Sequence, residues 1–138
     1  MHYFISCTIE PSNTTANPLL QPVHLSAGIL RGAIFDFPPG PNGQVFVSLW
    51  HMTNQILPTN RDQSYTADNR AVRAQLWYPF DDTANEFVLV GYAADTKYNH
   101  TIHIELDVKE PGEPDIMEAI VILAKSMETL ADWLRTYM

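Results

Sequence analysis

Short segments in which apolar and polar residues alternate fill most of the first 108 residues, and they constrain the fold more than any other feature. A period of two places successive side chains on opposite faces of a β-strand. Such segments run over residues 2–9, 28–37, 71–78 and 101–108. In the second of them, strict alternation predicts one face made of Ile29, Arg31, Ala33, Phe35 and Phe37.

Further strand signals lie between these segments. Residues 19–25 favour a short edge strand, because Pro22 cannot donate a hydrogen bond to a neighbouring strand. Residues 44–51 are almost continuously apolar, which is typical of a strand at the centre of a sheet. Residues 87–92 form another segment, and Pro38–Gly43 is a strong turn signal.

Seven or eight short strands with turns between them, and no helical period before Pro114, predict a mainly β fold. The expected architecture is an antiparallel β-sandwich, jelly-roll-like, over residues 1–108. A hinge rich in proline and glycine follows at residues 109–114, and residues 115–138 form a C-terminal amphipathic α-helix.

The helix is predicted from an apolar stripe that repeats in alternating steps of four and three residues. This heptad spacing keeps one stripe of a helix turned towards a partner. Asp115 is expected to cap the helix, with Glu118 three residues later. The expected oligomerisation residues are Ile116, Ile120, Leu123, Met127, Leu130, Leu134 and Tyr137.

The positions beside the stripe are also apolar or small, and none of them carries a charge. Two-stranded coiled coils often carry Glu/Lys pairs there, so the width of the stripe favours a trimer or a larger bundle. A helix that packs on its own sheet would show much the same pattern. Both arrangements stay open at the level of the sequence. The flanking residues are Met117, Ala119, Ala124, Ser126, Ala131 and Trp133.

Composition and charge exclude several classes of function. The net charge of −8 disfavours binding to nucleic acid, which depends on neutralising phosphates. Cys7 is the only cysteine, so one chain can build neither a disulfide framework nor a thiolate metal cluster. No secretory signal peptide is recognised after Met1, and the longest apolar run, Ala119–Ala124, is too short to span a membrane.

The sequence also lacks the signs of an enzyme. It contains no nucleophile elbow, P-loop, dinucleotide fingerprint or zinc-protease helix, so we predict no catalytic residues and no cofactor. Asp95, His100 and His103 could be imagined as metal ligands. Residues three apart in a strand point to opposite faces, however, so no metal site is predicted. His51 is interpreted as a buried histidine with satisfied hydrogen bonds.

Aromatic residues offer an alternative function, a carbohydrate- or ligand-binding module that the helix would make multivalent. Trp77 shares a strand face with Arg73 and Gln75, so it is expected to be exposed at a ligand or subunit contact. Tyr65, in the polar loop Thr59–Asn69, is a further candidate for that contact. Trp50 and Tyr92 are expected to fill the sandwich core instead.

Several motifs give residues 28–108 a resemblance to a group of small β-sandwich proteins of phage and environmental bacterial origin. The motifs are Gly28–Leu30 at the start of a strand, the Phe37–Gly40 turn, the Ile56–Asn60 segment and the final strand, His100–Val108 after Tyr98 and Asn99. The resemblance implies a structural component of a virion or another extracellular assembly. It implies no catalytic residues.

These inferences together predict a non-enzymatic structural protein. We expect it to form a homo-oligomer, preferably a homotrimer, through its C-terminal coiled coil. Its place would be in a virion or another extracellular assembly, as a phage capsid decoration protein, a tail component or a filament component. The expected partners are other copies of the chain and a capsid or filament lattice, with neither nucleic acid nor membrane among them.

Overall fold

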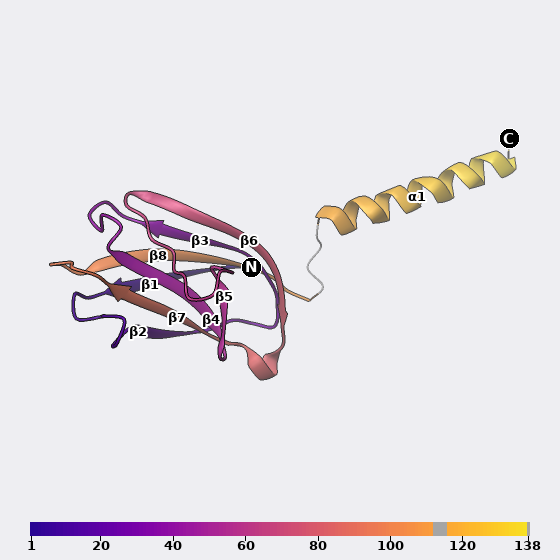
Figure 1. Cartoon of the computed structure of the whole chain (residues 1–138). Helices are drawn as coiled ribbons and strands as arrows, with labels where there is room; N and C mark the ends of the chain where they lie inside the picture. The colour runs from indigo at the N-terminus through magenta and orange to yellow at the C-terminus, as the bar shows by residue number, and fades with distance from the viewer. Residues whose placement is uncertain (112–115, 138) are drawn as a thin grey trace.

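The computed structural model describes residues 1–111 and 116–137. Within these ranges the chain forms eight β-strands, one short 3-10 helix (η1) and one α-helix (Figure 1). The elements in chain order are β1 (His2–Ile9), β2 (Leu19–His24), β3 (Gly28–Phe37), β4 (Val45–His51), β5 (Asn54–Leu57), β6 (Arg70–Phe80), η1 (Asp82–Ala84), β7 (Glu86–Ala93), β8 (His100–Lys109) and α1 (Ile116–Tyr137).

The strands form two four-stranded antiparallel sheets. Sheet A has the order β1-β8-β3-β6 and sheet B the order β2-β7-β4-β5. Strands equally far from the β4–β5 turn pair with each other, so β1 meets β8, β2 meets β7 and β3 meets β6. The chain therefore forms a long antiparallel ribbon that is rolled up into two layers. The rolled ribbon is held together by two further pairings, β3 with β8 in sheet A and β4 with β7 in sheet B. This arrangement is a jelly roll, as predicted.

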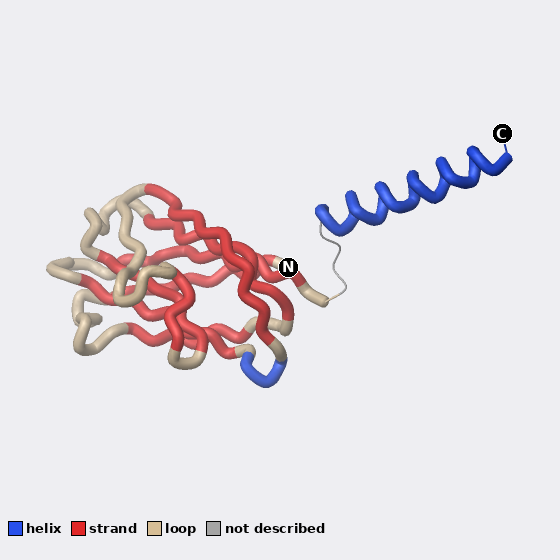
Figure 2. Tube along the Cα trace, turned by 45° about the vertical axis from the view of Figure 1, so that its right-hand side comes forward, coloured by secondary structure: helices blue, strands red, loops and turns tan. Residues whose placement is uncertain are grey.

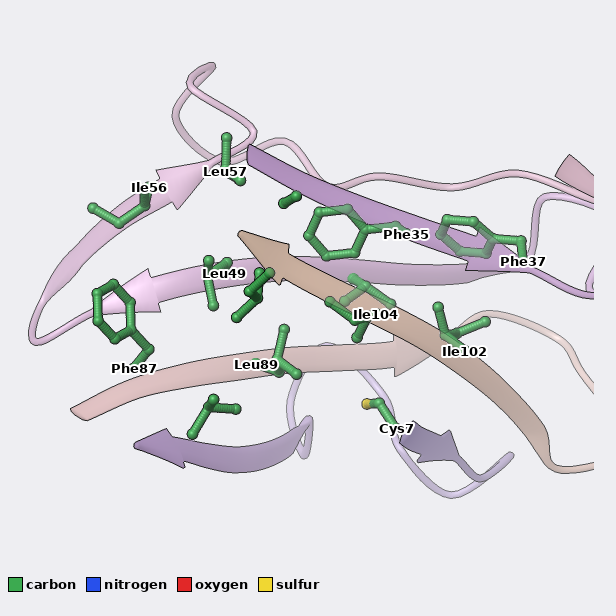
Figure 3. Close-up of a cluster of buried hydrophobic side chains, with 14 of the residues drawn as sticks. Cys7, Phe35, Phe37, Leu49, Ile56, Leu57, Phe87, Leu89, Ile102 and Ile104 are labelled. Carbon is green, nitrogen blue, oxygen red and sulfur yellow. The ribbon is translucent and has the colours of Figure 1, made fainter. Parts of the chain in front are cut away.

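The core lies between the two sheets (Figure 3). Each sheet contributes the side chains of one face, because alternate residues of a strand point the same way. Phe35 and Phe37 of β3 lie opposite side chains such as Leu49 and Leu89 of sheet B, and all four are fully buried. Every residue of this core cluster falls between Cys7 and Val108.

Most strand predictions are confirmed. In β8 the alternating set Ile102, Ile104, Leu106 and Val108 is buried, as the sequence indicated. Strand β2 lies at the edge of sheet B, where Pro22 is tolerated, and β4 lies at an internal position between β7 and β5.

The predicted alternation through residues 28–37 is wrong at its start. The register of β3 shifts against both neighbouring strands between Leu30 and Gly32, which marks a β-bulge. A bulge inserts one unpaired residue and reverses the side on which the following residues fall. Leu30 therefore shares the buried face with Ala33 and Phe35, whereas Arg31 stays partly exposed.

The predicted C-terminal helix is present as α1, a single continuous helix (Figure 2). None of its described side chains belongs to the core cluster. The predicted cap at Asp115 lies outside the described residues. The division into residues 1–108, 109–114 and 115–138 remains a prediction.

Gly28 and Gly32 of β3 offer a matched test of the β3–β8 packing. A Cβ added at Gly28 would overlap the main-chain oxygen of Lys109, whereas at Gly32 the nearest atom, the oxygen of Ala74, is 3.7 Å away. We expect Gly28→Ala to lower the free energy of unfolding by about 1–3 kcal/mol, the usual cost of overpacking. Gly32→Ala should leave it unchanged within about 1 kcal/mol. Urea unfolding of both variants measures the difference, and equal stabilities would contradict the described register.

Candidate functional site

The apolar stripe of α1 is exposed to solvent. Ile120, Leu123, Met127, Leu130 and Leu134 are each between 43% and 63% exposed. Large apolar side chains gathered on one exposed face mark an interaction surface. Ile116 and Tyr137, the other two predicted oligomerisation residues, are the first and last residues of α1. In the described chain, then, the stripe does not pack on the chain's own sheets.

The side of α1 away from the stripe is mostly polar, although Val121 on that side is also exposed. Arg135 donates a hydrogen bond to Asp132 over 3.3 Å, and the Thr129 hydroxyl donates to the Lys125 carbonyl over 3.1 Å. Such contacts are typical of a solvated helix face. Among the described residues, no helix is long and apolar enough to cross a membrane.

Arg73 and Trp77 lie together on the outer face of β6, as predicted from their spacing. The Trp77 ring is 59% exposed, and Lys109 Nζ lies 5.9 Å from its centroid, within cation–π range. Arg73 and Gln75 border a shallow hollow in the outer face of sheet A, above Gly32. Whether this surface contacts a ligand or a subunit remains a prediction.

Tyr65 lies apart from Arg73 and Trp77. Its main chain pairs with Val47 of sheet B through hydrogen bonds of 2.8 and 2.9 Å, and its ring centroid is 4.9 Å from that of Phe35. Burial raises the pKa of its phenol. The loop Thr59–Asn69 therefore anchors Tyr65 against the core, which the polar composition of the loop did not indicate.

His51 is a structural residue, as interpreted from the sequence. Its side chain is 6% exposed, with Nδ1 2.5 Å from the Tyr78 hydroxyl and Nε2 2.6 Å from the Ala84 carbonyl. Because a carbonyl can only accept, Nε2–H donates to Ala84 and Nδ1 accepts from Tyr78. The imidazole joins sheet B to sheet A and to η1.

The histidines of β8 are not brought together. His100 and His103 fall on opposite faces of the strand, and His103 Nδ1 lies 3.2 Å from the Ser6 hydroxyl. Within residues 1–111 and 116–137, no group of three or more His, Cys, Asp or Glu side chains could hold a metal ion.

The expectation that Trp50 and Tyr92 fill the core is wrong. The inward residues of β4 are Val45, Val47 and Leu49, so Trp50 points to the outer face of sheet B, where it is only partly buried. Tyr92 is on the same face, stacked on Phe46 at 4.8 Å between ring centroids. Trp50 follows Leu49 directly, so the two side chains must point to opposite faces of β4. Because β4 is apolar almost throughout, its sequence does not indicate which of the two faces is buried.

Comparison with known proteins identifies the fold. No protein-family model and no curated protein sequence matches this chain. Among solved structures, a chain of the cyanophage Pam1 capsid asymmetric unit is similar with a TM-score of 0.52 and 11% identity, over 77% of this chain and 81% of that one. A chain of tomato aspermy virus has a TM-score of 0.49 and 13% identity, over 83% and 81%. The expected likeness to small β-sandwich virion components is confirmed at the level of the fold.

From the burial of Cys7 we predict how the free energy of unfolding depends on pH. It is fully buried, and burial raises the pKa of its thiol from 9.0 to about 11. From about pH 9 to pH 11 only the unfolded chain ionises this group, so the free energy of unfolding should fall, by up to about 2.7 kcal/mol.

A Cys7→Ala chain is the control for that dependence. It should be less stable at neutral pH because a cavity remains, yet it should lose less stability between pH 9 and pH 11. Tyr65 and Tyr78, whose pKa values are also raised by burial, contribute equally in both chains. Urea unfolding across this range measures the difference, and parallel losses would show that Cys7 is not buried as described.

Proposed function

We propose that this protein is a non-catalytic structural component of a virion and that it assembles with copies of itself through α1. The observation that carries the proposal is the exposed apolar stripe of α1, appended to a jelly-roll domain that completes its core without it. The described side chains of α1 add nothing to the core cluster, so the apolar stripe gains stability by burial against another surface.

The jelly roll supports the virion part of the proposal. Eight strands in two sheets give a rigid block whose loops and faces can meet neighbours in a lattice, and viral capsids are a common setting for this architecture. The similar chain comes from a cyanophage capsid. We infer a place on or in a capsid, with a decoration protein, a tail component or a filament component as the particular forms.

The heptad supports a trimer as the preferred assembly. Three or more helices bury a wider face than two do, and both flanks of the stripe are uncharged and apolar or small. Ala124 and Ala131 on one flank allow close approach of neighbouring helices. The sheet edges and the loop Thr59–Asn69 are then left for contacts with a lattice.

The double variant Leu123→Asp/Leu130→Asp tests the assembly helix. Two carboxylates in the buried seam would lose their hydration, so we expect the oligomer to dissociate to single chains. The β-sandwich, whose core excludes both residues, should keep its circular dichroism spectrum and its melting temperature. Light scattering after size exclusion measures the mass.

The matched control is Lys125→Gln/Thr129→Asp, which makes the same change in net charge on the polar side of α1. This chain should retain the mass of the unmodified protein. Retention of full mass by the Leu123→Asp/Leu130→Asp chain would contradict assembly through the stripe.

A second candidate function is carbohydrate binding on the outer face of sheet A. The hollow above Gly32 is bordered by Arg73, Gln75, Glu105 and Asp107, which can form hydrogen bonds with sugar hydroxyls. Asp107 Oδ2 accepts from Arg31 Nε over 2.9 Å, whereas Oδ1, 3.8 Å from His2 Nε2, accepts no hydrogen bond in the described part of the chain. Trp77 beside this hollow supplies an exposed ring on which a sugar could stack.

Trp77→Ala tests this candidate. We expect glycan affinity, measured by affinity electrophoresis in immobilised polysaccharides, to fall at least about tenfold, equivalent to ~1.4 kcal/mol. Tyr98→Ala, which removes another exposed ring far from the hollow, should bind as the unmodified chain does. Unchanged retention of the Trp77→Ala chain would contradict carbohydrate binding at this face.

A further inference from the structure

The outer face of sheet B carries a continuous apolar surface that the core does not need. Cross-strand pairing places its side chains in three neighbouring rows over β2, β7 and β4. Leu20 at its margin is 62% exposed, and the aromatic rings are partly exposed. We call this surface the sheet B patch. Its apolar members are Leu20, Pro22, Phe46, Trp50, Val88, Val90 and Tyr92.

The outer face of sheet B differs from the outer face of sheet A in its charge. The three rows contain no acidic or basic side chain, and the first titratable side chains, those of His24 and Glu86, lie in the next row. The outer face of sheet A instead carries Arg73, Glu105 and Asp107. Copies that each bear a net charge of −8 repel one another, so they approach with least cost where neither surface is charged.

The polar groups of the patch also favour a protein surface over a sugar. Trp50 Nε1 already donates to the Ser48 hydroxyl over 3.0 Å, and Ser48 is itself buried. Trp50 pairs with Val88 on β7 and with Gln55 on β5, and the Gln55 side-chain nitrogen already donates to the main-chain oxygens of Pro58, Asn60 and Gln63. A carbohydrate needs several free donors and acceptors around a stacking ring, and this face supplies few.

The size of the patch limits what can bind it. Three strands about 4.8 Å apart and three rows about 6.6 Å apart give an area on the order of 300 Å². A freely diffusing partner usually buries about 800 Å² on each side of a stable interface. A partner that is already tethered needs much less, because its effective concentration is in the millimolar range.

The chain contains such a tether. Six residues, 110–115, separate β8 from α1, and an extended segment of that length spans at most about 20 Å. Two packed sheets with their side chains are about as thick. A tether of this length keeps the β-sandwiches of copies joined through α1 close to the helix axis and within reach of one another.

We propose that the sheet B patch faces this axis and packs against the same patch of neighbouring copies. The inference rests on the proposed assembly through α1 and adds to it a second interface between the jelly rolls. The patch is too small to hold copies together alone, so it orients β-sandwiches that α1 has already gathered.

Cross-linking of the full chain tests the proposal. Leu20→Cys places a thiol on the patch, and Phe4→Cys, at a residue 78% exposed on the outer face of sheet A, is the matched control. The native thiol of Cys7 is buried and stays unreactive in both. With a bismaleimide spacer of about 10 Å, the distance between packed sheets, Leu20→Cys should give a cross-linked fraction several-fold above that of Phe4→Cys.

The solution mass of the same samples separates the two proposals. An oligomer in which Leu20→Cys links no better than Phe4→Cys overturns the patch interface and leaves assembly through α1 intact. A single chain at all concentrations overturns both. A single chain in which the Leu20→Cys thiol also resists a simple maleimide would show that the chain's own helix covers the patch, which likewise overturns the proposal.

Discussion

Burial of one face of every strand between two sheets is the constraint on which the rest of the structure depends. The packed layer consists mainly of apolar side chains, and β3 and β8 of sheet A contribute fully buried ones, namely Leu30, Phe35, Phe37, Ile102, Leu106 and Val108. Antiparallel pairing satisfies the main-chain hydrogen bonds of both layers. His51 is a buried polar residue, and both of its ring nitrogens are hydrogen-bonded.

Because the strands and loops between Cys7 and Val108 form the core cluster, the remaining surfaces can differ in character. The outer face of sheet A is mixed, with charged side chains around the hollow above Gly32 and an exposed Trp77 beside it. The outer face of sheet B is apolar and uncharged over its central rows. Helix α1 carries a third surface, the heptad stripe. The proposed contact between copies would bury both apolar surfaces.

Local periodicity made most of this fold predictable from the sequence. In β8, four apolar residues alternate with polar ones, and the structure buries those four. Prediction failed where a residue's side is decided by non-local pairing. The bulge at Arg31 depends on the neighbouring strands β8 and β6, and the local signal for it is Gly32, because an isolated glycine inside a strand often marks a bulge. Likewise, the main-chain pairing of Tyr65 with Val47 places the Tyr65 ring in contact with Phe35, although the surrounding loop is polar.

The mass of the full chain in solution tests the central claim most directly. Light scattering over a range of concentrations should give an oligomer, with three times the mass of one chain as the preferred value. The same measurement on a chain that ends at Gly112 should give a single chain, because the sheet B patch is too small to hold copies together without α1. A full-length protein that stays a single chain at every concentration would contradict assembly through the helix.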